Sequence, residues 1–529
     1  MHMKRSFTAA VIILALAASV GPWPAPLATT AHAAHAGSTG APWPPAWQDT
    51  QPPRSDFTPP RFEAPSAAHC QRAPTTREVA GVDDRQQVVR SRGIGRESDV
   101  AASTAIRMPP DARGELIAKL TRPFAPAAAV SAAAAAPMSL GAESDKTRSG
   151  EGLFVPPTAP RSEAPQVTPP SRQREANQAV VTAGVVDDNA DFGEYLAYRS
   201  RNAGQPVRER DISERYLLEV TDNQGRPVHD AEVAVQSPGV TVPVMWARTD
   251  TGGRVWLHPR AFMATDNQGG LGSLSSLGIA VRKDGQQARA TLLRGQSQAV
   301  QIRLGEQSQV KRPRLDLVFM VDATGSMGDE IGKLKASMRA MADQIAQLPG
   351  QPDICYGLVA YRDRGDAFIT RAHDLTDDLS AFQNLLSRVQ AQGGGDTPEA
   401  LNEALHEVVH GLSWRASAAR LVVLVADAPP HLDYGGPQYD IDMQAALAKG
   451  IKLFAVGASG LDPVGEYIFR QIAQYTAGRF VFLTYKNAAH PASGPGTQTV
   501  HDVKNYSVQT LDKLVVRLVG EELARLVKS

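Results

Sequence analysis

The sequence lacks several short motifs by which enzymes and metal proteins are recognised. It contains no GxxxxGK(S/T) phosphate loop and no CxxC pair, so nucleotide and structural zinc sites lack their usual anchors. We likewise expect no HExxH motif and no zinc protease. The GxSxG turn that presents a nucleophilic serine is missing as well. We therefore expect a protein that is not an enzyme, and a hydrolase is the weakest of the alternatives that we consider.

Cysteine is nearly absent, with two residues in a chain of 529. Cys70 lies in a stretch rich in proline and alanine, and Cys355 begins an apolar run, so we expect Cys355 to be a buried free thiol. A domain of this size buries enough core to fold without disulfides, so few cysteines do not argue against export. The scarcity fits a bacterial envelope protein.

Net charge is absent too, because 55 basic residues balance 55 acidic ones. No global field would draw the chain to nucleic acid or to an anionic membrane surface, and we expect neither as a partner. The apolar stretch 7–20 is shorter than the roughly 20 residues that cross a bilayer. No membrane span is therefore expected once the N-terminal signal described next has been removed.

The N-terminal third divides into a predicted signal peptide and a linker. Cations within residues 1–5, the apolar stretch that follows and small residues near Ala36 give residues 1–36 the layout of a secretory signal. Residues 37–174 are rich in proline and alanine, with pairs such as Pro44-Pro45 that interrupt regular structure, and we interpret them as a disordered linker. The protein is therefore expected to be exported, and to be periplasmic, secreted or on the cell surface.

Two further segments precede the C-terminal domain. Residues 175–211 form a connecting segment in which an acidic turn at 187–191 leads into a short amphipathic helix. Residues 212–306 show short alternating segments separated by DNQG and DTGG turns, which predicts a small all-β sandwich. The stretches 220–235 and 249–257 resemble the carboxypeptidase regulatory-like, or transthyretin-like, modules, and the resemblance implies a spacer or a binding platform.

Residues 314–529 have the pattern of a doubly wound α/β domain with a parallel sheet. Apolar runs typical of buried strands alternate with helical segments. These runs cover 317–321, 356–361, 421–426, 453–456 and 480–483. The first helical segment carries an apolar stripe that steps by three or four residues, at Ile331, Leu334, Met338, Met341, Ile345 and Leu348. That stripe is expected to lie on the sheet.

Oxygen-bearing side chains follow two of these strands. Asp322, Thr324 and Ser326 alternate directly after the first strand, and Asp427 ends the strand at 421–426. Between them in the sequence, Thr397 follows the three glycines 393–395 on a loop that precedes a helix. Carboxylate and hydroxyl oxygens suit a hard cation such as Mg²⁺. Helix capping by the same residue types is the alternative reading of the first segment alone.

The order and spacing of these three segments resemble the metal-ion-dependent adhesion site of the von Willebrand factor type A family, with Thr324 where the family usually has serine. The resemblance covers about 314–529. It implies that Asp322, Thr324, Ser326, Thr397 and Asp427 hold Mg²⁺ or Mn²⁺, directly or through water, and that a protein partner offers an acidic side chain to the ion. The alternative is a non-catalytic envelope scaffold whose metal is structural.

Overall fold

The computed structural model describes residues 70–81, 180–238, 243–262, 274–307 and 312–527. Its largest feature is a nine-stranded sheet with strand order β1-β12-β11-β10-β13-β14-β15-β2-β16. The five central strands run parallel and are the ones that the apolar runs predict: β11 (Asp353–Tyr361), β10 (Arg314–Asp322), β13 (Ala419–Ala426), β14 (Ile451–Gly457) and β15 (Arg479–Thr484). The predicted mixed α/β fold with a parallel core is confirmed.

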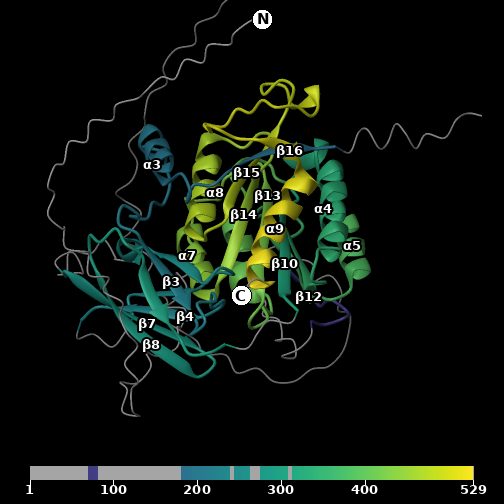
Figure 1. Cartoon of the computed structure of the whole chain (residues 1–529). Helices are drawn as coiled ribbons and strands as arrows, with labels where there is room; N and C mark the ends of the chain where they lie inside the picture. Colours follow the sequence, from purple (N-terminus) through teal and green to yellow (C-terminus); the bar gives the residue numbers. More distant parts are fainter. Residues whose placement is uncertain (1–69, 82–179, 239–242, 263–273, 308–311, 528–529) are drawn as a thin grey trace, which may run out of the picture. The chain divides into compact units, whose positions relative to one another are not determined.

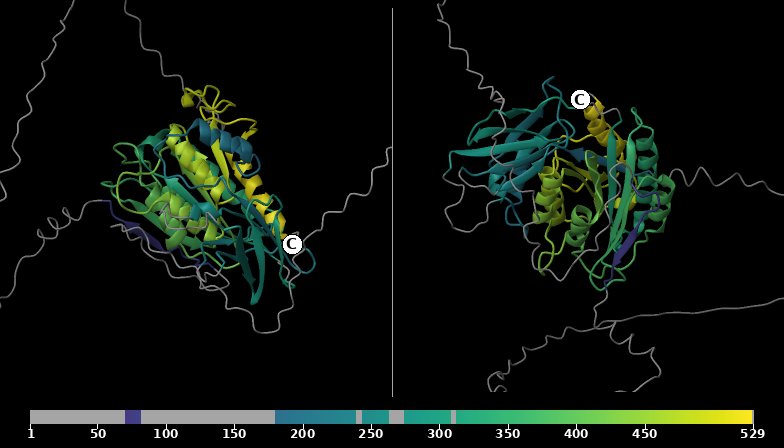
Figure 2. Two further views of the ribbon diagram at one scale, coloured as in Figure 1. Left: turned by 90° about the vertical axis from the view of Figure 1, so that its left-hand side faces the viewer. Right: turned by 90° about the horizontal axis from the view of Figure 1, so that it is seen from below.

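Helices cover both faces of this sheet (Figure 1). One face packs against α4 (Ile331–Ala346), α5 (Leu379–Arg388) and α9 (Leu511–Val527). The other packs against α6 (Leu401–His406), α7 (Tyr439–Lys449) and α8 (Pro463–Tyr475). The predicted apolar stripe of α4, at Ile331, Leu334, Met338, Met341 and Ile345, is buried in the first of these two layers. Figure 2 gives two further views of the same layers.

Antiparallel strands extend the sheet on both sides, which the sequence analysis did not predict. On one side β12 (Thr370–Thr376) pairs with β11, and β1 (Thr76–Val79) pairs with β12. On the other side β2 (Thr182–Val186) pairs with β15, and β16 (Val508–Thr510) pairs with β2. The segments assigned to the linker and to the connector therefore each contribute a strand to the C-terminal domain.

The cysteine prediction is wrong, because Cys70 and Cys355 form a disulfide. Residues 70–79 lie along β12, where Gln71 bridges to Thr376 and β1 follows, and this brings Cys70 against the buried strand β11. The assignment of residues 70–81 to a disordered linker is wrong for the same reason. The predicted signal peptide and the rest of the linker lie outside the described residues.

The segment after β2 follows its prediction. Asp187 accepts the backbone N–H of Asn189 and forms the acidic turn. The helix α3 (Phe192–Arg201) begins at Asp191, whose side chain accepts the N–H of Glu194 as an N-cap. In the described part of the chain, no helix combines the length and the apolar character that crossing a membrane requires.

Residues 212–306 form the predicted small β-sandwich. One sheet has the order β6-β3-β9 and the other the order β5-β4-β7-β8. The strands are β3 (Tyr216–Thr221), β4 (Glu232–Gln236), β5 (Met245–Arg248), β6 (Arg254–Leu257), β7 (Ser276–Lys283), β8 (Gln286–Leu293) and β9 (Val300–Arg303). The apolar cluster of the sandwich also includes Met443 and Leu447 of α7 and Tyr467 and Tyr475 of α8, so it is continuous with the C-terminal domain.

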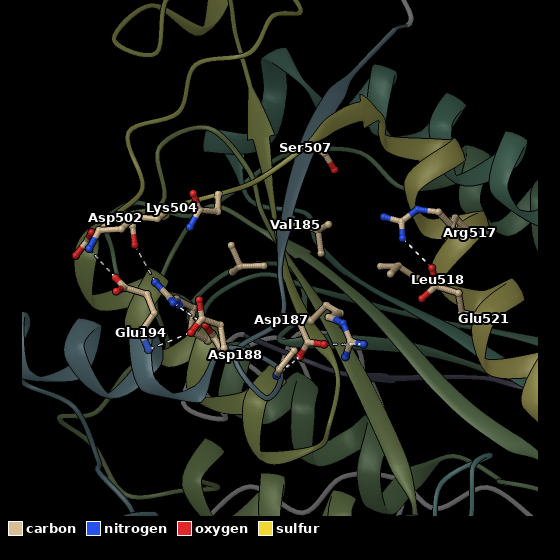
Figure 3. Close-up of a pocket in the computed structure, with 16 residues that line it drawn as sticks. Val185, Asp187, Asp188, Glu194, Asp502, Lys504, Ser507, Arg517, Leu518 and Glu521 are labelled. Atoms are coloured by element: carbon tan, nitrogen blue, oxygen red, sulfur yellow. Dashed lines mark hydrogen bonds and ion pairs between the residues drawn. The ribbon is translucent and has the colours of Figure 1, made fainter. Parts of the chain in front are cut away.

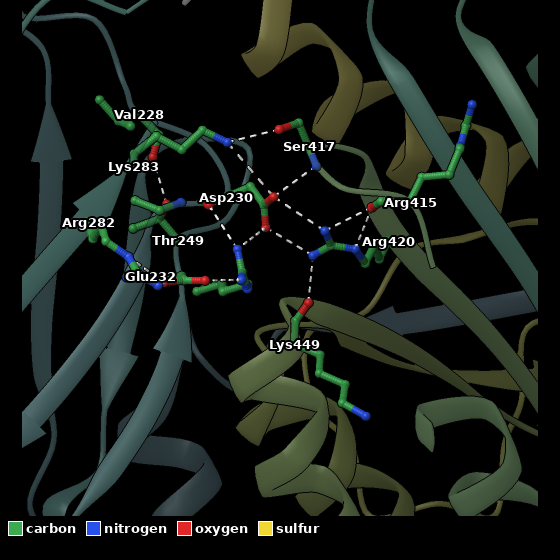
Figure 4. Close-up of polar contacts among 12 residues, drawn as sticks. Val228, Asp230, Glu232, Thr249, Arg282, Lys283, Arg415, Ser417, Arg420 and Lys449 are labelled. Atoms are coloured by element: carbon green, nitrogen blue, oxygen red, sulfur yellow. Dashed lines mark hydrogen bonds and ion pairs between the residues drawn. The ribbon is translucent and has the colours of Figure 1, made fainter. Parts of the chain in front are cut away.

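Asp230 provides a buried ionic contact between the sandwich and the C-terminal domain (Figure 4). The Arg420 guanidinium of β13 donates to both carboxylate oxygens, at 2.9 and 3.3 Å, and the Ser417 backbone N–H donates at 2.9 Å. Arg248 of β5 adds a third donor at 3.2 Å. Burial opposes the charge, but the two arginines hold the pKa of the Asp230 carboxyl below its usual value.

The disulfide leads to the first prediction. Replacement of Cys70 by alanine should lower the free energy of unfolding by about 2–4 kcal/mol, because the cross-link removes conformational entropy from the unfolded chain. Urea unfolding without reductant measures this change, and dithiothreitol should lower the stability of the wild type but not of Cys70→Ala. Two alkylatable thiols in the unfolded, unreduced wild type would contradict the disulfide.

The Asp230 contact leads to the second prediction. Asp230→Asn should lower the free energy of unfolding by about 3–5 kcal/mol, because Arg420 would keep a buried charge without its counter-ion. Asparagine preserves the shape and tolerates the left-handed backbone at this position, where φ is 55°. Asp284→Asn is the matched control, since Asp284 also has a positive φ of 47° but is exposed. Urea unfolding that gives equal stabilities for the two variants would contradict this role.

Candidate metal centre

The candidate site lies where two neighbouring parallel strands end. Val321 of β10 pairs with Val425 of β13, so Asp322 and Asp427 leave the sheet at the same edge. Both strands are buried along nearly their whole length, which fixes this register through their packing. The sequence pattern therefore places two carboxylates side by side.

Short polar contacts join the two carboxylates, and each hydroxyl donates to the carboxylate nearer to it. Asp322 Oδ1 accepts from the Thr324 backbone N–H at 2.9 Å and from Thr324 Oγ1 at 2.6 Å. Thr324 Oγ1 lies 3.1 Å from Ser326 Oγ, which donates to Asp427 Oδ1 at 3.0 Å. The structure thus brings together four of the five predicted site residues, with the threonine hydroxyl in the position expected of a serine.

Thr397, the fifth predicted residue, is exposed and stands outside these polar contacts. Its loop nevertheless packs on the Asp322–Ser326 segment, because the Gly325 N–H donates to Gly393 O at 2.8 Å. Gly394 has a φ of 64°, and a Cβ there would lie 2.9 Å from Thr324 Cβ. The close approach of the two loops therefore requires glycine at this position.

Glu399 is a buried acid beside the site that the sequence analysis did not assign. Burial and the charges of Asp322, Asp363 and other carboxylates raise its pKa to about 9. A carboxylate just before an apolar helical stripe looks like an ordinary first-turn residue. Its position, two residues after Thr397 on the same loop, could have indicated that it lies near the site.

The electrostatics of the site fit a cation. Burial raises the pKa of Asp322 to about 7, and burial also raises the pKa of Asp427. Asp322 Oδ2 and Glu399 Oε2 are buried and have no close hydrogen-bond donor among the described residues, although the Tyr361 hydroxyl is near enough to lower the pKa of Asp322 in part. Buried acceptors without a close donor are costly, and a hard divalent ion would satisfy them.

A separate pocket of about 430 Å³ lies among β2, α3, α8 and α9 (Figure 3). Its charged residues pair with one another, as in Asp188 with Arg470 at 2.6 Å and Arg517 with Glu521 at 2.8 Å. The lining has six acidic and four basic residues, so the pocket keeps a small excess of negative charge. The predicted site residues do not line it.

The expectation of no HExxH motif is wrong. Residues 406–410 read HEVVH, which is the HExxH pattern of two histidines four residues apart on a helix, and they lie on the sheet face that α6, α7 and α8 cover. Val408 belongs to the apolar stripe expected for this helix, so the segment was interpreted as ordinary core. The structure places both histidines against Asp442 of α7.

Comparison with known proteins identifies the domain. Residues 316–490 match the model of the von Willebrand factor type A domain. The chain is 30% identical over 119 residues to alpha-protein kinase vwkA of Dictyostelium discoideum, covering 22% of this chain and 19% of the kinase. It is 22% identical over 240 residues to integrin beta-6 of Mus musculus, covering 40% of this chain and 29% of the integrin. The match therefore spans less than a third of the length of either relative.

Among solved structures, BatB of Bacteroides thetaiotaomicron, described as a conserved hypothetical protein, aligns over its full length and over 41% of this chain. The sequence identity is 15% and the TM-score is 0.28.

Glu399 leads to a prediction about pH. A carboxyl with a raised pKa holds a proton in the folded state that the unfolded state releases above about pH 4.5, so its contribution to stability is lost as pH rises toward about 9. In EDTA, the melting temperature of the wild type should fall between pH 7 and 9, and Glu399→Gln should flatten this fall. Asp396→Asn, an exposed change on the same loop, is the control. An equally steep fall in Glu399→Gln would show that another group is responsible.

Proposed function

We propose that the von Willebrand factor type A domain of this chain binds Mg²⁺ or Mn²⁺ through Asp322, Thr324, Ser326, Thr397 and Asp427, and that it uses the ion to bind a protein partner. The observation that carries this proposal is the run of close oxygen atoms between the two strand ends, with Asp322 Oδ2 buried beside it. Carboxylate and hydroxyl oxygens suit a hard cation.

The division of labour within the site follows from charge. Asp322 and Asp427 supply the negative charge, and Thr324 and Ser326 supply neutral oxygens. The bound ion would supply a Lewis-acidic position that an aspartate or glutamate of the partner fills. The exposed Thr397 side chain and its loop border the solvent side of the site, where such a partner would arrive. Recognition would therefore depend on the metal.

The comparisons favour partner binding over catalysis. The match to integrin beta-6 covers 40% of this chain and 29% of the integrin, whereas the match to vwkA covers 22% of this chain and 19% of the kinase. We accordingly propose an adhesion-type function and no enzyme activity. The disulfide between Cys70 and Cys355 supports an oxidising compartment, in keeping with a protein exported to the periplasm, the medium or the cell surface.

A structural metal in a non-catalytic envelope scaffold is the alternative. The Gly325–Gly393 contact supports it, because an ion at Asp322 would also stiffen the adjacent loop. Affinity capture from the native organism, with Mg²⁺ or with EDTA, separates the two functions. A partner that is retained only with Mg²⁺ and lost in folded Asp427→Ala indicates metal-dependent binding, and metal-independent retention indicates a scaffold.

The site itself is tested by titration calorimetry with Mg²⁺ and Mn²⁺. Asp322→Ala and Asp427→Ala should each weaken binding by at least about tenfold, since each removes a charged ligand or its closest support. Asp396→Ala, which removes an exposed carboxylate one residue before Thr397, should leave the affinity unchanged. Folded Asp322→Ala and Asp427→Ala proteins that bind the ions as the wild type does would refute the assignment.

A further inference from the structure

His406, His410 and Asp442 form a second group of candidate metal ligands, on the sheet face opposite α4 and α9. His406 ends α6, and His410 lies one turn later in the π-helical turn Glu407–Gly411, so the two rings stand on one side with centroids 4.3 Å apart. Asp442 approaches them from α7. One ligand atom from each of the three residues lies within 4.8 Å of the others.

The distances to Asp442 are slightly shorter than the spacing that a tetrahedral ion needs. His406 Nδ1 lies 3.0 Å and His410 Nε2 also 3.0 Å from Asp442 Oδ1. Zinc bonds to nitrogen and oxygen are about 2.0–2.2 Å long, so the ligand atoms of a tetrahedral site stand roughly 3.3–3.5 Å apart. The two histidine nitrogens lie within 4.8 Å of each other, so small side-chain movements would bring all three ligand atoms to this spacing.

The Asp442 side chain is more deeply buried than the two histidine side chains. The Asp442 side chain is 2% exposed, whereas those of His406 and His410 are each 13% exposed. The carboxylate therefore forms the inner side of the group, and solvent reaches the histidine side.

From this geometry we propose that His406 Nδ1, His410 Nε2 and Asp442 form a Zn²⁺ site that joins α6 to α7 and leaves a fourth position for water. Two imidazoles and one carboxylate suit a borderline cation, whereas the oxygen set at Asp322 suits a hard one. The two sites would therefore select different metals in the same domain.

The remaining acid of the motif takes no part in the site. In a zinc protease, the glutamate of HExxH acts as the general base. Here Glu407 is fully buried, its carboxylate lies outside the ligand group, and a Cβ on Gly411 would lie 2.4 Å from its Oε1. A base without access to solvent cannot reach a peptide substrate, so the zinc would be structural.

Lys449 competes with the metal for the same histidine. Its Nζ lies 3.2 Å from His410 Nδ1 and donates to Val409 O at 3.0 Å. An ammonium that donates to Nδ1 keeps the ring proton on Nε2, which is the atom that the metal requires. Removal of this ammonium should strengthen zinc binding.

Calorimetric titration of the EDTA-treated, dialysed full chain with Zn²⁺, together with the visible spectrum of its Co²⁺ form, tests the proposal. The wild type should show a tetrahedral Co²⁺ spectrum and a zinc-dependent rise in melting temperature. His410→Gln and Asp442→Asn should lose at least about tenfold in zinc affinity. Lys449→Met should bind zinc more tightly, and this variant keeps all three ligands if the others fail to fold.

Three controls make the result specific. Glu407→Gln removes the buried acid of the same motif and should leave zinc affinity unchanged. His501→Gln removes a histidine that pairs with one carboxylate, Glu466, at 2.9 Å, and should also have no effect. Asp322→Ala should retain zinc binding, which keeps this test separate from that of the Mg²⁺ site. Equal zinc affinity in the wild type, His410→Gln and Lys449→Met would overturn the proposal.

Discussion

The parallel pairing of β10 with β13 in one register is the constraint on which the candidate metal centre depends. Both strands are buried on both faces, so a slip by one residue would exchange the side chains that face α4 for those that face α6. The same slip would also move Asp322 away from Asp427. The geometry of the site is therefore a property of the core, and the loops only complete it.

The sandwich adds a second constraint, because its apolar cluster includes residues of α7 and α8. Asp230 fixes the contact with directional hydrogen bonds from Arg420, while the shared apolar cluster holds the two parts together without directional preference. Since α7 also carries Asp442, the helix that supports the proposed zinc site is held from two sides. A module expected to be a spacer or a binding platform thus packs directly on the von Willebrand factor type A domain.

The sequence allowed the centre of the fold to be predicted but not its edges. Long apolar runs identify β10 and β13 because both of their faces are buried, and Asp322 and Asp427 follow from the rule that parallel strands end at one edge. The four-residue strand β1 is half exposed and has no such pattern. Its partner is set by the fold, as is the pairing of Cys70 with Cys355 across 285 positions. Glu399 was missed because its environment depends on how a loop returns to the sheet.

The pairing of β1 with β12 also has a consequence for the order of events during synthesis. Thr76 and His373 face each other across the two strands but are 297 positions apart in the chain. At roughly 5–20 residues per second, the N-terminal strand is made roughly 15–60 s before its partner. During that interval β1 has no native strand to pair with, and the same is true of β2, which waits for β15. The sheet can close its edges only after nearly the whole chain has been made, which favours folding after translation over domain-by-domain folding.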